Sequence, residues 1–270
     1  LPSELGRLTR IKEVIVHSNE LRGSIPSFLG ELSEIEKLSI GENSLSGSLS
    51  TELGQLTWMR WLDVASNNLH GILPSEIGSL RGLMRLHLND NYFSGTLPSE
   101  LGQLTKLTEF SLASNELSGI VPTEIGNLRR AEIIELHSNS LTGSLPASLG
   151  QLSNIKECSL YSNMISGPIP DSVGQLSSLL FLGLWNNSLT GTLPRDLGSL
   201  AALEQLYVDG NMLTGRIPPN FGLLSNLQRL YLFDNSLSGR IPQRLCSFSQ
   251  LQQIAVDCEE IHCNCGCICG

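Results

Sequence analysis

The stretch Asn19-Glu20-Leu21-Arg22-Gly23-Ser24-Ile25-Pro26 defines the repeat of this chain, because the same residue pattern recurs with a fixed period of 24 residues. Stepping by 24 from Asn19 gives an unbroken series of ten asparagines that ends at Asn235. The same step from Gly23 gives ten glycines. One inserted or deleted residue would have broken this register. A fixed period of this size indicates a solenoid, in which each repeat packs on its two neighbours.

Each repeat carries seven apolar positions, and no charged residue occupies any of these seven columns. Within one unit, Leu38-x-Ile40 alternates with a period of two, which is typical of a short strand. Eleven such segments, from 11–16 to 251–256, predict a parallel sheet with a spacing of about 4.8 Å. The segment Leu29-Gly30-x-Leu32 predicts a 3₁₀ turn on the outer side of the solenoid, away from the sheet.

The asparagine column predicts a hydrogen-bonded ladder inside the solenoid. An amide side chain offers two donors and an acceptor, so stacked asparagines can satisfy the backbone groups where each repeat turns off the sheet. Glycine at the fourth position after the asparagine permits a turn with positive φ, and Pro26 holds Ile25 extended.

This arrangement resembles the plant-type leucine-rich repeat, which has the same period and whose Asn-x-Leu-x-Gly-x-Ile-Pro core residues 19–26 match in full. The resemblance implies an α/β solenoid, mostly β-strands and 3₁₀ turns, wound as a right-handed superhelix with a concave parallel sheet of about 11 strands. It extends over residues 1–257. Proteins of this type include ectodomains of plant receptor-like kinases and secreted polygalacturonase inhibitors. The resemblance therefore implies recognition, with no enzymatic activity and no cofactor.

The two ends of the chain depart from this pattern. The chain begins within a repeat at Leu1-Pro2 and lacks the cysteine-bearing N-terminal cap usual in the family, so we expect the natural protein to continue N-terminally. Residues 246–270 predict a cysteine-rich C-terminal cap, an ending that resembles leucine-rich-repeat proteins of diatoms and related algae. Its six cysteines are Cys246, Cys258, Cys263, Cys265, Cys267 and Cys269.

Two interpretations of these six cysteines stay open. They can form up to three disulfides in an oxidising compartment, with the pairing undetermined. Alternatively, the alternating run from Cys263 to Cys269 can bind a thiophilic metal ion. We favour the disulfides and expect no metal site. The seventh cysteine, Cys158, lies in an apolar column and predicts a buried free thiol.

Charge narrows the range of partners. The chain has 17 Lys+Arg against 26 Asp+Glu, a net charge of -9, and the exposed strand columns carry ten acids against three bases. This excess argues against nucleic acid and acidic membrane surfaces, and favours a protein, a peptide or a neutral glycan. The longest apolar run, 179–185, is far shorter than the roughly 20 residues of a membrane-spanning helix. We expect a monomer in an extracellular or cell-surface setting, with Asn186 as a candidate glycosylation site.

Two patterns suggest other activities. Asp63, His87 and Ser111 share one column in successive repeats and match a hydrolase triad by residue type. A flat sheet supplies no oxyanion hole, so we expect no catalysis. A column of Ser or Thr in eight of ten repeats resembles ice-binding leucine-rich-repeat proteins, although small polar residues are also common at this position. Its members are Ser46, Ser94, Ser118, Thr142, Ser166, Thr190, Thr214 and Ser238.

The candidate ligand-binding site is a cluster of aromatic residues on the exposed columns of four consecutive repeats. Outside it, Trp61 is the one aromatic on these columns. Exposed aromatic patches mark interaction sites, although these rings could instead pack on one another and stiffen the sheet. Acids border the cluster. The predicted site residues are Tyr161, Phe181, Trp185, Tyr207, Asp209, Tyr231 and Phe233, with Glu157 and Asp234 at the border.

These observations predict a non-enzymatic extracellular recognition domain, belonging to a larger receptor-like or cell-surface protein. A secreted inhibitor of a foreign hydrolase and a structural adhesion module of a cell wall are the alternatives. The inhibitor would bind in the same way as the receptor domain, whereas the adhesion module would bind glycan weakly at several sites and have no single tight partner.

Overall fold

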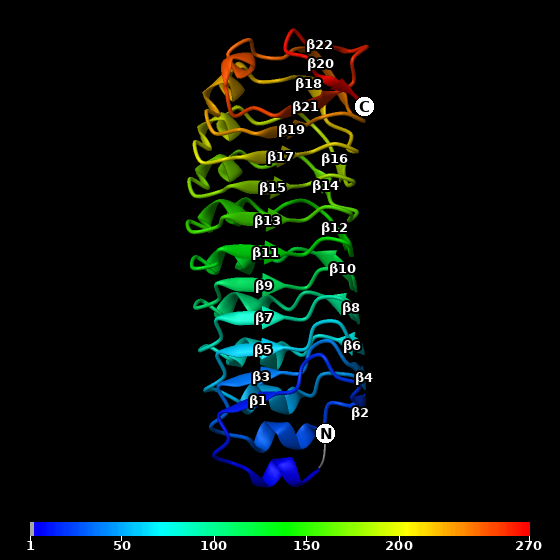
Figure 1. Cartoon of the computed structure of the whole chain (residues 1–270), viewed down its shortest axis with the longest axis vertical. Coiled ribbons are helices and arrows are strands. Elements are labelled where there is room, and N and C mark those ends of the chain that lie inside the picture. The colour runs from blue at the N-terminus through cyan, green and yellow to red at the C-terminus, as the bar shows by residue number, and fades with distance from the viewer. Residues whose placement is uncertain (1–2) are drawn as a thin grey trace.

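The computed structural model describes residues 3–270 and shows one elongated stack of repeats whose two chain ends lie at opposite ends of the stack (Figure 1). Leu1 and Pro2, on which the expectation about the N-terminal cap rests, lie outside the described residues. Typical repeats contribute one strand to a main sheet, one strand to a second layer of sheet and one 3₁₀ helix. The predicted solenoid is therefore confirmed.

The main sheet is parallel and its strands follow chain order, so each repeat pairs with the next. The eleven predicted strands are present, and the tail adds a twelfth that the repeat pattern did not predict. The strands are β1 (Glu13–Ile15), β3 (Lys37–Ser39), β5 (Trp61–Asp63), β7 (Arg85–His87), β9 (Glu109–Ser111), β11 (Ile133–Glu135), β13 (Glu157–Ser159), β15 (Phe181–Gly183), β17 (Gln205–Tyr207), β19 (Arg229–Tyr231), β21 (Gln253–Val256) and β23 (Ile268–Cys269).

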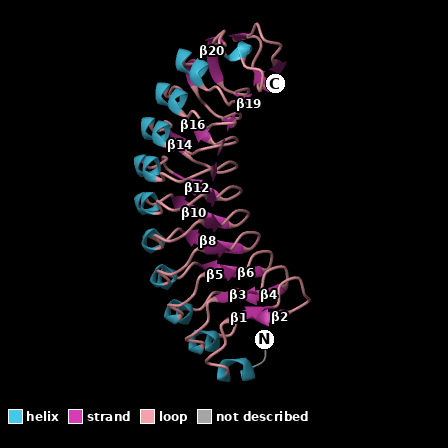
Figure 2. Ribbon diagram, turned by 60° about the vertical axis from the view of Figure 1, so that its left-hand side comes forward, coloured by secondary structure: helices cyan, strands magenta, loops and turns pink. Residues whose placement is uncertain are grey.

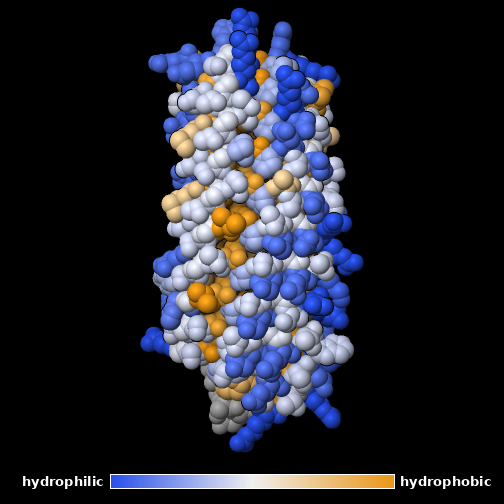
Figure 3. Space-filling view, turned by 180° about the vertical axis from the view of Figure 1, so that it is seen from behind, coloured by the Kyte–Doolittle hydropathy of each residue, from blue (hydrophilic) through white to orange (hydrophobic). Residues whose placement is uncertain are grey.

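A second layer of short parallel strands lies beside the main sheet, in three segments. Seen from behind, residues of intermediate hydropathy (white) extend along the molecule, with apolar residues (orange) scattered among them (Figure 3). The first segment is β2 (Arg22–Ser24), β4 (Ser44–Gly47), β6 (Asn68–Ile72), β8 (Tyr92–Thr96), β10 (Glu116–Ile120) and β12 (Ser140–Thr142). The others are β14 (Ser166–Gly167) with β16 (Ser188–Leu189), and β18 (Thr214–Arg216) with β20 (Ser236–Arg240) and β22 (Ile261–His262).

The 3₁₀ helices lie along the outer side of the curved stack (Figure 2). The glycine within them allows successive helices to stack closely, since a Cβ on Gly102 would lie 2.5 Å from the carbonyl oxygen of Glu124 in the next repeat. The helices are η1 (Ser3–Arg7), η2 (Ser27–Glu31), η3 (Thr51–Gln55), η4 (Ser75–Ser79), η5 (Ser99–Gln103), η6 (Thr123–Asn127), η7 (Ala147–Gln151), η8 (Asp171–Gln175), η9 (Arg195–Ser199), η10 (Pro219–Leu223) and η11 (Leu245–Ser247).

The asparagine ladder forms as predicted. The Nδ2 of Asn67 donates to the carbonyl oxygens of Ile40, Val64 and Ala65 at 3.1–3.2 Å, and its Oδ1 accepts from the backbone N–H of Leu45 at 2.9 Å. The side chain thus links two repeats while it remains buried, and the same bonding repeats along the column. After the last asparagine, the carboxylate of Asp257 accepts from the backbone N–H groups of two residues in the preceding repeat.

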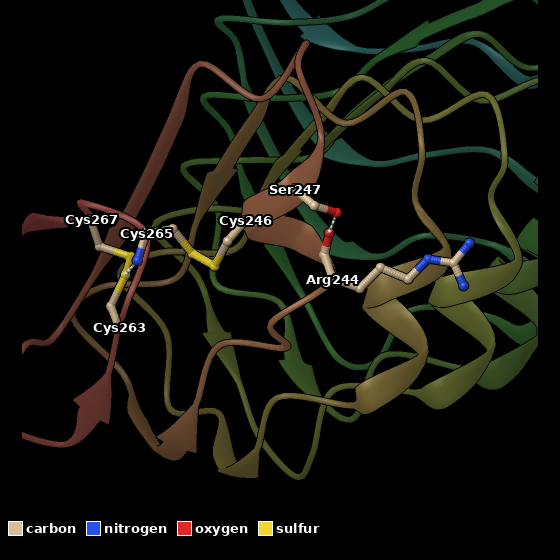
Figure 4. The surroundings of a disulfide bond; sticks show 6 residues. All are labelled: Arg244, Cys246, Ser247, Cys263, Cys265 and Cys267. Carbon is tan, nitrogen blue, oxygen red and sulfur yellow. Dashed lines mark hydrogen bonds between the residues drawn. A yellow bond between two sulfur atoms is a disulfide. The ribbon is translucent and has the colours of Figure 1, made fainter.

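The cysteine-rich tail packs on the last repeat and extends both sheets, because β22 pairs with β20 and β23 pairs with β21. The structure joins the six tail cysteines as Cys246–Cys265, Cys258–Cys269 and Cys263–Cys267. Figure 4 shows two of these disulfides side by side.

The sulfur atoms of Cys263, Cys265 and Cys267 lie within 4.8 Å of one another, the one group of potential metal ligands in residues 3–270. Each is bonded in a disulfide, so none is free to act as a thiolate ligand. Cys158 is a buried free thiol, and burial raises its pKa to about 12. Over the same residues, no helix combines the length and the apolar character needed to span a membrane.

Candidate ligand-binding site

The predicted aromatic residues meet on the exposed face of the main sheet. In strands such as β17 and β19 the middle residue is buried and its neighbours point outward, because strand side chains alternate between two faces. Seven rings then form one continuous set of contacts across five repeats, which we call the aromatic row. It consists of His137, Tyr161, Phe181, Trp185, Tyr207, Tyr231 and Phe233.

Face-to-face stacking holds the first part of the row. The ring of Tyr161 lies between His137 and Trp185, with centroid distances of 4.1 Å and 3.5 Å and interplanar angles of 8° and 9°. Both faces of Tyr161 are therefore covered. His137 was not predicted as a site residue, although its place one repeat before Tyr161, in the same column, was the available signal.

Edge contacts and hydrogen bonds hold the second part. The ring of Phe181 is nearly perpendicular to those of Trp185 and Tyr207, at 6.2 Å and 5.5 Å. Tyr207 stacks on Tyr231 at 4.6 Å, and its hydroxyl donates to Gln205 at 2.7 Å. The rings remain half-buried. The rings thus support one another and still present an accessible apolar surface, and their role in binding stays a prediction.

A shallow depression of about 340 Å³ lies along the row. Ser159 and Gly183 are the small residues of one column, and the flanking columns carry larger side chains. A Cβ on Gly183 would lie 2.6 Å from the ring of Trp185 and 2.9 Å from that of Phe181, so the glycine leaves room for both rings. We call this the acidic depression. Gly183 lies beneath these rings and does not line the depression, whose lining consists of Glu135, His137, Glu157, Ser159, Tyr161, Leu180, Phe181, Trp185, Glu204 and Gln205.

Burial shifts the pKa values of several side chains near the row. Desolvation lowers the pKa of His137, opposed by the charges of Glu135 and Asp90. Desolvation, aided by Glu135, raises the pKa of Tyr161. Desolvation also raises the pKa of Asp209, and the charge of Asp234 adds to this. One buried carboxylate oxygen of Asp209 has no hydrogen-bond partner among the described residues, so this predicted site residue lies beside the row at an energetic cost.

Trp61 forms a separate group nearer the N-terminus. The ammonium of Lys37 lies 3.7 Å from its ring centroid and the guanidinium of Arg85 lies 5.1 Å away. The guanidinium of Arg85 also pairs with Glu109 at 3.0 Å. The exposed face therefore has a basic aromatic region as well as the acidic one.

The residues of the hydrolase-like trio do not interact as a triad. His87 pairs with Glu109 at 3.1 Å, and Asp63 accepts from the hydroxyl of Ser39 at 2.8 Å. The hydroxyl of Ser111 is buried without a hydrogen-bond partner in the described chain. The base and the nucleophile are thus not coupled, which gives no support to hydrolysis.

Two further predicted features lie off the aromatic row. In the column of Ser and Thr residues, five of the eight hydroxyls donate to the backbone carbonyl of a glycine in the preceding repeat, for example Ser118 to Gly95 at 3.2 Å. Hydrogen bonds between successive repeats therefore explain why most positions of this column carry Ser or Thr. Asn186, the candidate glycosylation site, is exposed in a left-handed turn (φ 53°) directly after Trp185.

Comparison with known proteins gives a consistent result. A sequence model of a leucine-rich repeat region matches residues 46–167, and a model of the single leucine-rich repeat matches 178–200, 202–224 and 226–248. No curated protein matches the sequence. Among solved structures, a TDR receptor is 32% identical with a TM-score of 0.91, over 95% of this chain and 44% of the receptor.

Two further solved structures are informative. The Arabidopsis receptor kinase HAESA, in complex with the peptide hormone IDA and the co-receptor SERK1, is 32% identical with a TM-score of 0.85, over 95% of this chain and 43% of HAESA. A plant ice-binding protein is 26% identical with a TM-score of 0.71, over 88% of this chain and 76% of that protein. The chain thus spans less than half of the two receptor chains.

Proposed function

Because this chain belongs to the leucine-rich-repeat proteins, we propose that it is a recognition domain that binds a peptide or protein on the concave face of its main sheet. The aromatic row carries this proposal, because it offers rigid and half-exposed rings over five repeats. Aromatic side chains dominate binding hot spots, since they bury large apolar areas at a low cost in conformational entropy.

The geometry favours a peptide over a glycan. A sugar ring binds aromatic residues through a free ring face, whereas Tyr161 is covered on both faces and Trp185 on one. Ring edges, the acidic depression and the carboxylates remain accessible, and these suit a chain of mixed apolar and polar side chains. The domain works without catalysis and without a cofactor.

The setting of this function is extracellular or at the cell surface, with the chain forming part of a receptor-like protein. Three disulfides within a short tail require an oxidising compartment to form and persist. The solved receptor ectodomains that this chain resembles support the same setting. We expect the domain to be monomeric without its ligand.

Peptide selection tests this proposal directly. A random peptide library displayed on phage is selected on the immobilised, disulfide-intact chain. We expect enrichment of peptides whose binding is lost with Trp185→Ala and retained with Tyr92→Ala, a control ring that is 52% exposed on the second sheet. Enrichment that survives Trp185→Ala, or no enrichment at all, would reject the concave face as the binding surface. Circular dichroism melting shows whether each variant is folded.

A second candidate function is adsorption to ice through the second sheet. Its outward positions over residues 44–192 carry one charged residue, Glu116, among hydroxyls and exposed apolar side chains such as Ile72 and Ile120. The similarity to a plant ice-binding protein supports this candidate. Thermal hysteresis in the native protein that is lost with Ile120→Lys would establish it, and the absence of hysteresis and of ice shaping would exclude it.

A further inference from the structure

Given the proposed peptide recognition, on which this inference rests, we propose that the acidic depression binds the guanidinium group of an arginine side chain in the ligand. The depression is lined by the small residue Ser159, by aromatic rings and by three glutamates that come from three different repeats. Each of these features contributes separately to the selection of a guanidinium.

The charge of the depression is not balanced within the protein. Three other glutamates beside the main sheet have cationic partners: Glu36 pairs with Lys12 and Arg60, Glu109 with Arg85, and Glu132 with Lys156. Within residues 3–270, Glu135, Glu157 and Glu204 form no such ion pair, and no lysine or arginine lines the depression.

The neighbouring groups do not supply the missing cation. Lys156 is adjacent in sequence to Glu157, but its ammonium is bound by Glu132 at 2.7 Å. Glu204 accepts one hydrogen bond from the side-chain amide of Gln228 at 2.9 Å, which is a neutral donor. The lowered pKa of His137 keeps the one titratable base in the lining neutral near pH 7. Three carboxylates therefore face a site without a positive charge.

The shape of the depression selects a guanidinium over an ammonium group. A guanidinium is planar and weakly hydrated, and it donates to carboxylates in pairs, so it tolerates apolar rings at its sides while its edges reach acids. An ammonium is compact and strongly hydrated, so it would lose more solvation beside the rings of Phe181 and Trp185.

The same peptide-library selection also tests this inference. We expect the enriched peptides to share an arginine. Replacing that arginine by citrulline, which has nearly the same shape and no charge, should weaken binding about tenfold, the loss typical of a charged hydrogen-bonded pair. Enrichment without a basic residue, or with lysine as readily as arginine, would overturn the inference and leave the proposed function standing. No enrichment would reject both.

Matched variants of the protein locate the arginine. With the selected arginine peptide, Glu157→Gln should weaken binding about fivefold to tenfold, and with the citrulline peptide it should change binding little. Glu116→Gln removes the same charge from the second sheet and should leave both affinities unchanged. If Glu157→Gln weakens both peptides equally, or if Glu116→Gln has the same effect, the arginine does not bind in the depression. Isothermal titration calorimetry measures each affinity.

Discussion

Replacing Asn67 by alanine should remove one of the buried links between successive repeats. The backbone N–H of Leu45 has the Oδ1 of Asn67 as its partner at 2.9 Å, and Leu45 is completely buried. The N–H lies away from bulk solvent, so this donor would lose its hydrogen-bond partner within the protein.

The magnitude depends on how many groups lose their partner. The three carbonyl oxygens that Asn67 binds each keep another donor: Asn43 for Ile40, Asn91 for Val64 and the backbone of Glu42 for Ala65. One orphaned N–H then dominates, and we expect Asn67→Ala to lower the free energy of unfolding by about 2 kcal/mol, within a range of about 1–3 kcal/mol.

Asn19 provides a matched control in the same column. It is exposed, its Nδ2 donates to two carbonyls, and within residues 3–270 no repeat precedes it to supply a donor for its Oδ1. Asn19→Ala should therefore cost less than about 1 kcal/mol. Urea unfolding followed by circular dichroism measures both variants. Equal losses for the two, or a loss below about 0.5 kcal/mol for Asn67→Ala, would refute the ladder as a stabilising element.

Three further outcomes are expected. Under denaturing, non-reducing conditions one thiol should react, and in the native protein at pH 8 none should, because burial raises the pKa of Cys158 to about 12; a second reactive thiol would contradict the disulfide pairing. The pKa of Asp209 is raised, so its contribution to stability falls as pH rises above 3.8, the ordinary pKa of an aspartate. Asp209→Asn should therefore be more stable than the native protein at pH 7 and equally stable at pH 3. Thermal melting at the two pH values measures both differences. Ala131 is fully buried in a column that elsewhere carries Leu, Ile or Met, so Ala131→Leu should raise the urea midpoint, whereas a clear loss would mean that neighbouring side chains already fill the layer.

The repeat pattern predicted most of the fold because each of its columns meets one physical demand. The columns of Asn67 and Gly102 are examples: the first must donate to turn carbonyls, and the second must lie close to a neighbouring backbone. The strand β23 could not be predicted in this way, because Ile268–Cys269 lies in a shortened tail whose path depends on its disulfides.

The sequence predicted most of the residues of the candidate site, and it predicted the arrangement of their side chains less well. The repeat spacing placed Trp185 and Tyr161 on one face, but it does not state whether two rings stack on each other or point to solvent. His137 was missed although Tyr161 follows it in the same column, because the sequence does not state whether the two rings stack. The role of Gly183 also depends on ring positions, which are set by side-chain packing rather than by the repeat.

The position of a bound peptide tests the central claim most directly. A peptide from the selected pool, carrying a photoreactive benzoylphenylalanine, is cross-linked to the native chain, and the attached residues are identified by mass spectrometry. We predict cross-links to the outward positions of β11 through β19, along the aromatic row. Cross-links confined to the second sheet or to the 3₁₀ helices would contradict recognition through the concave face.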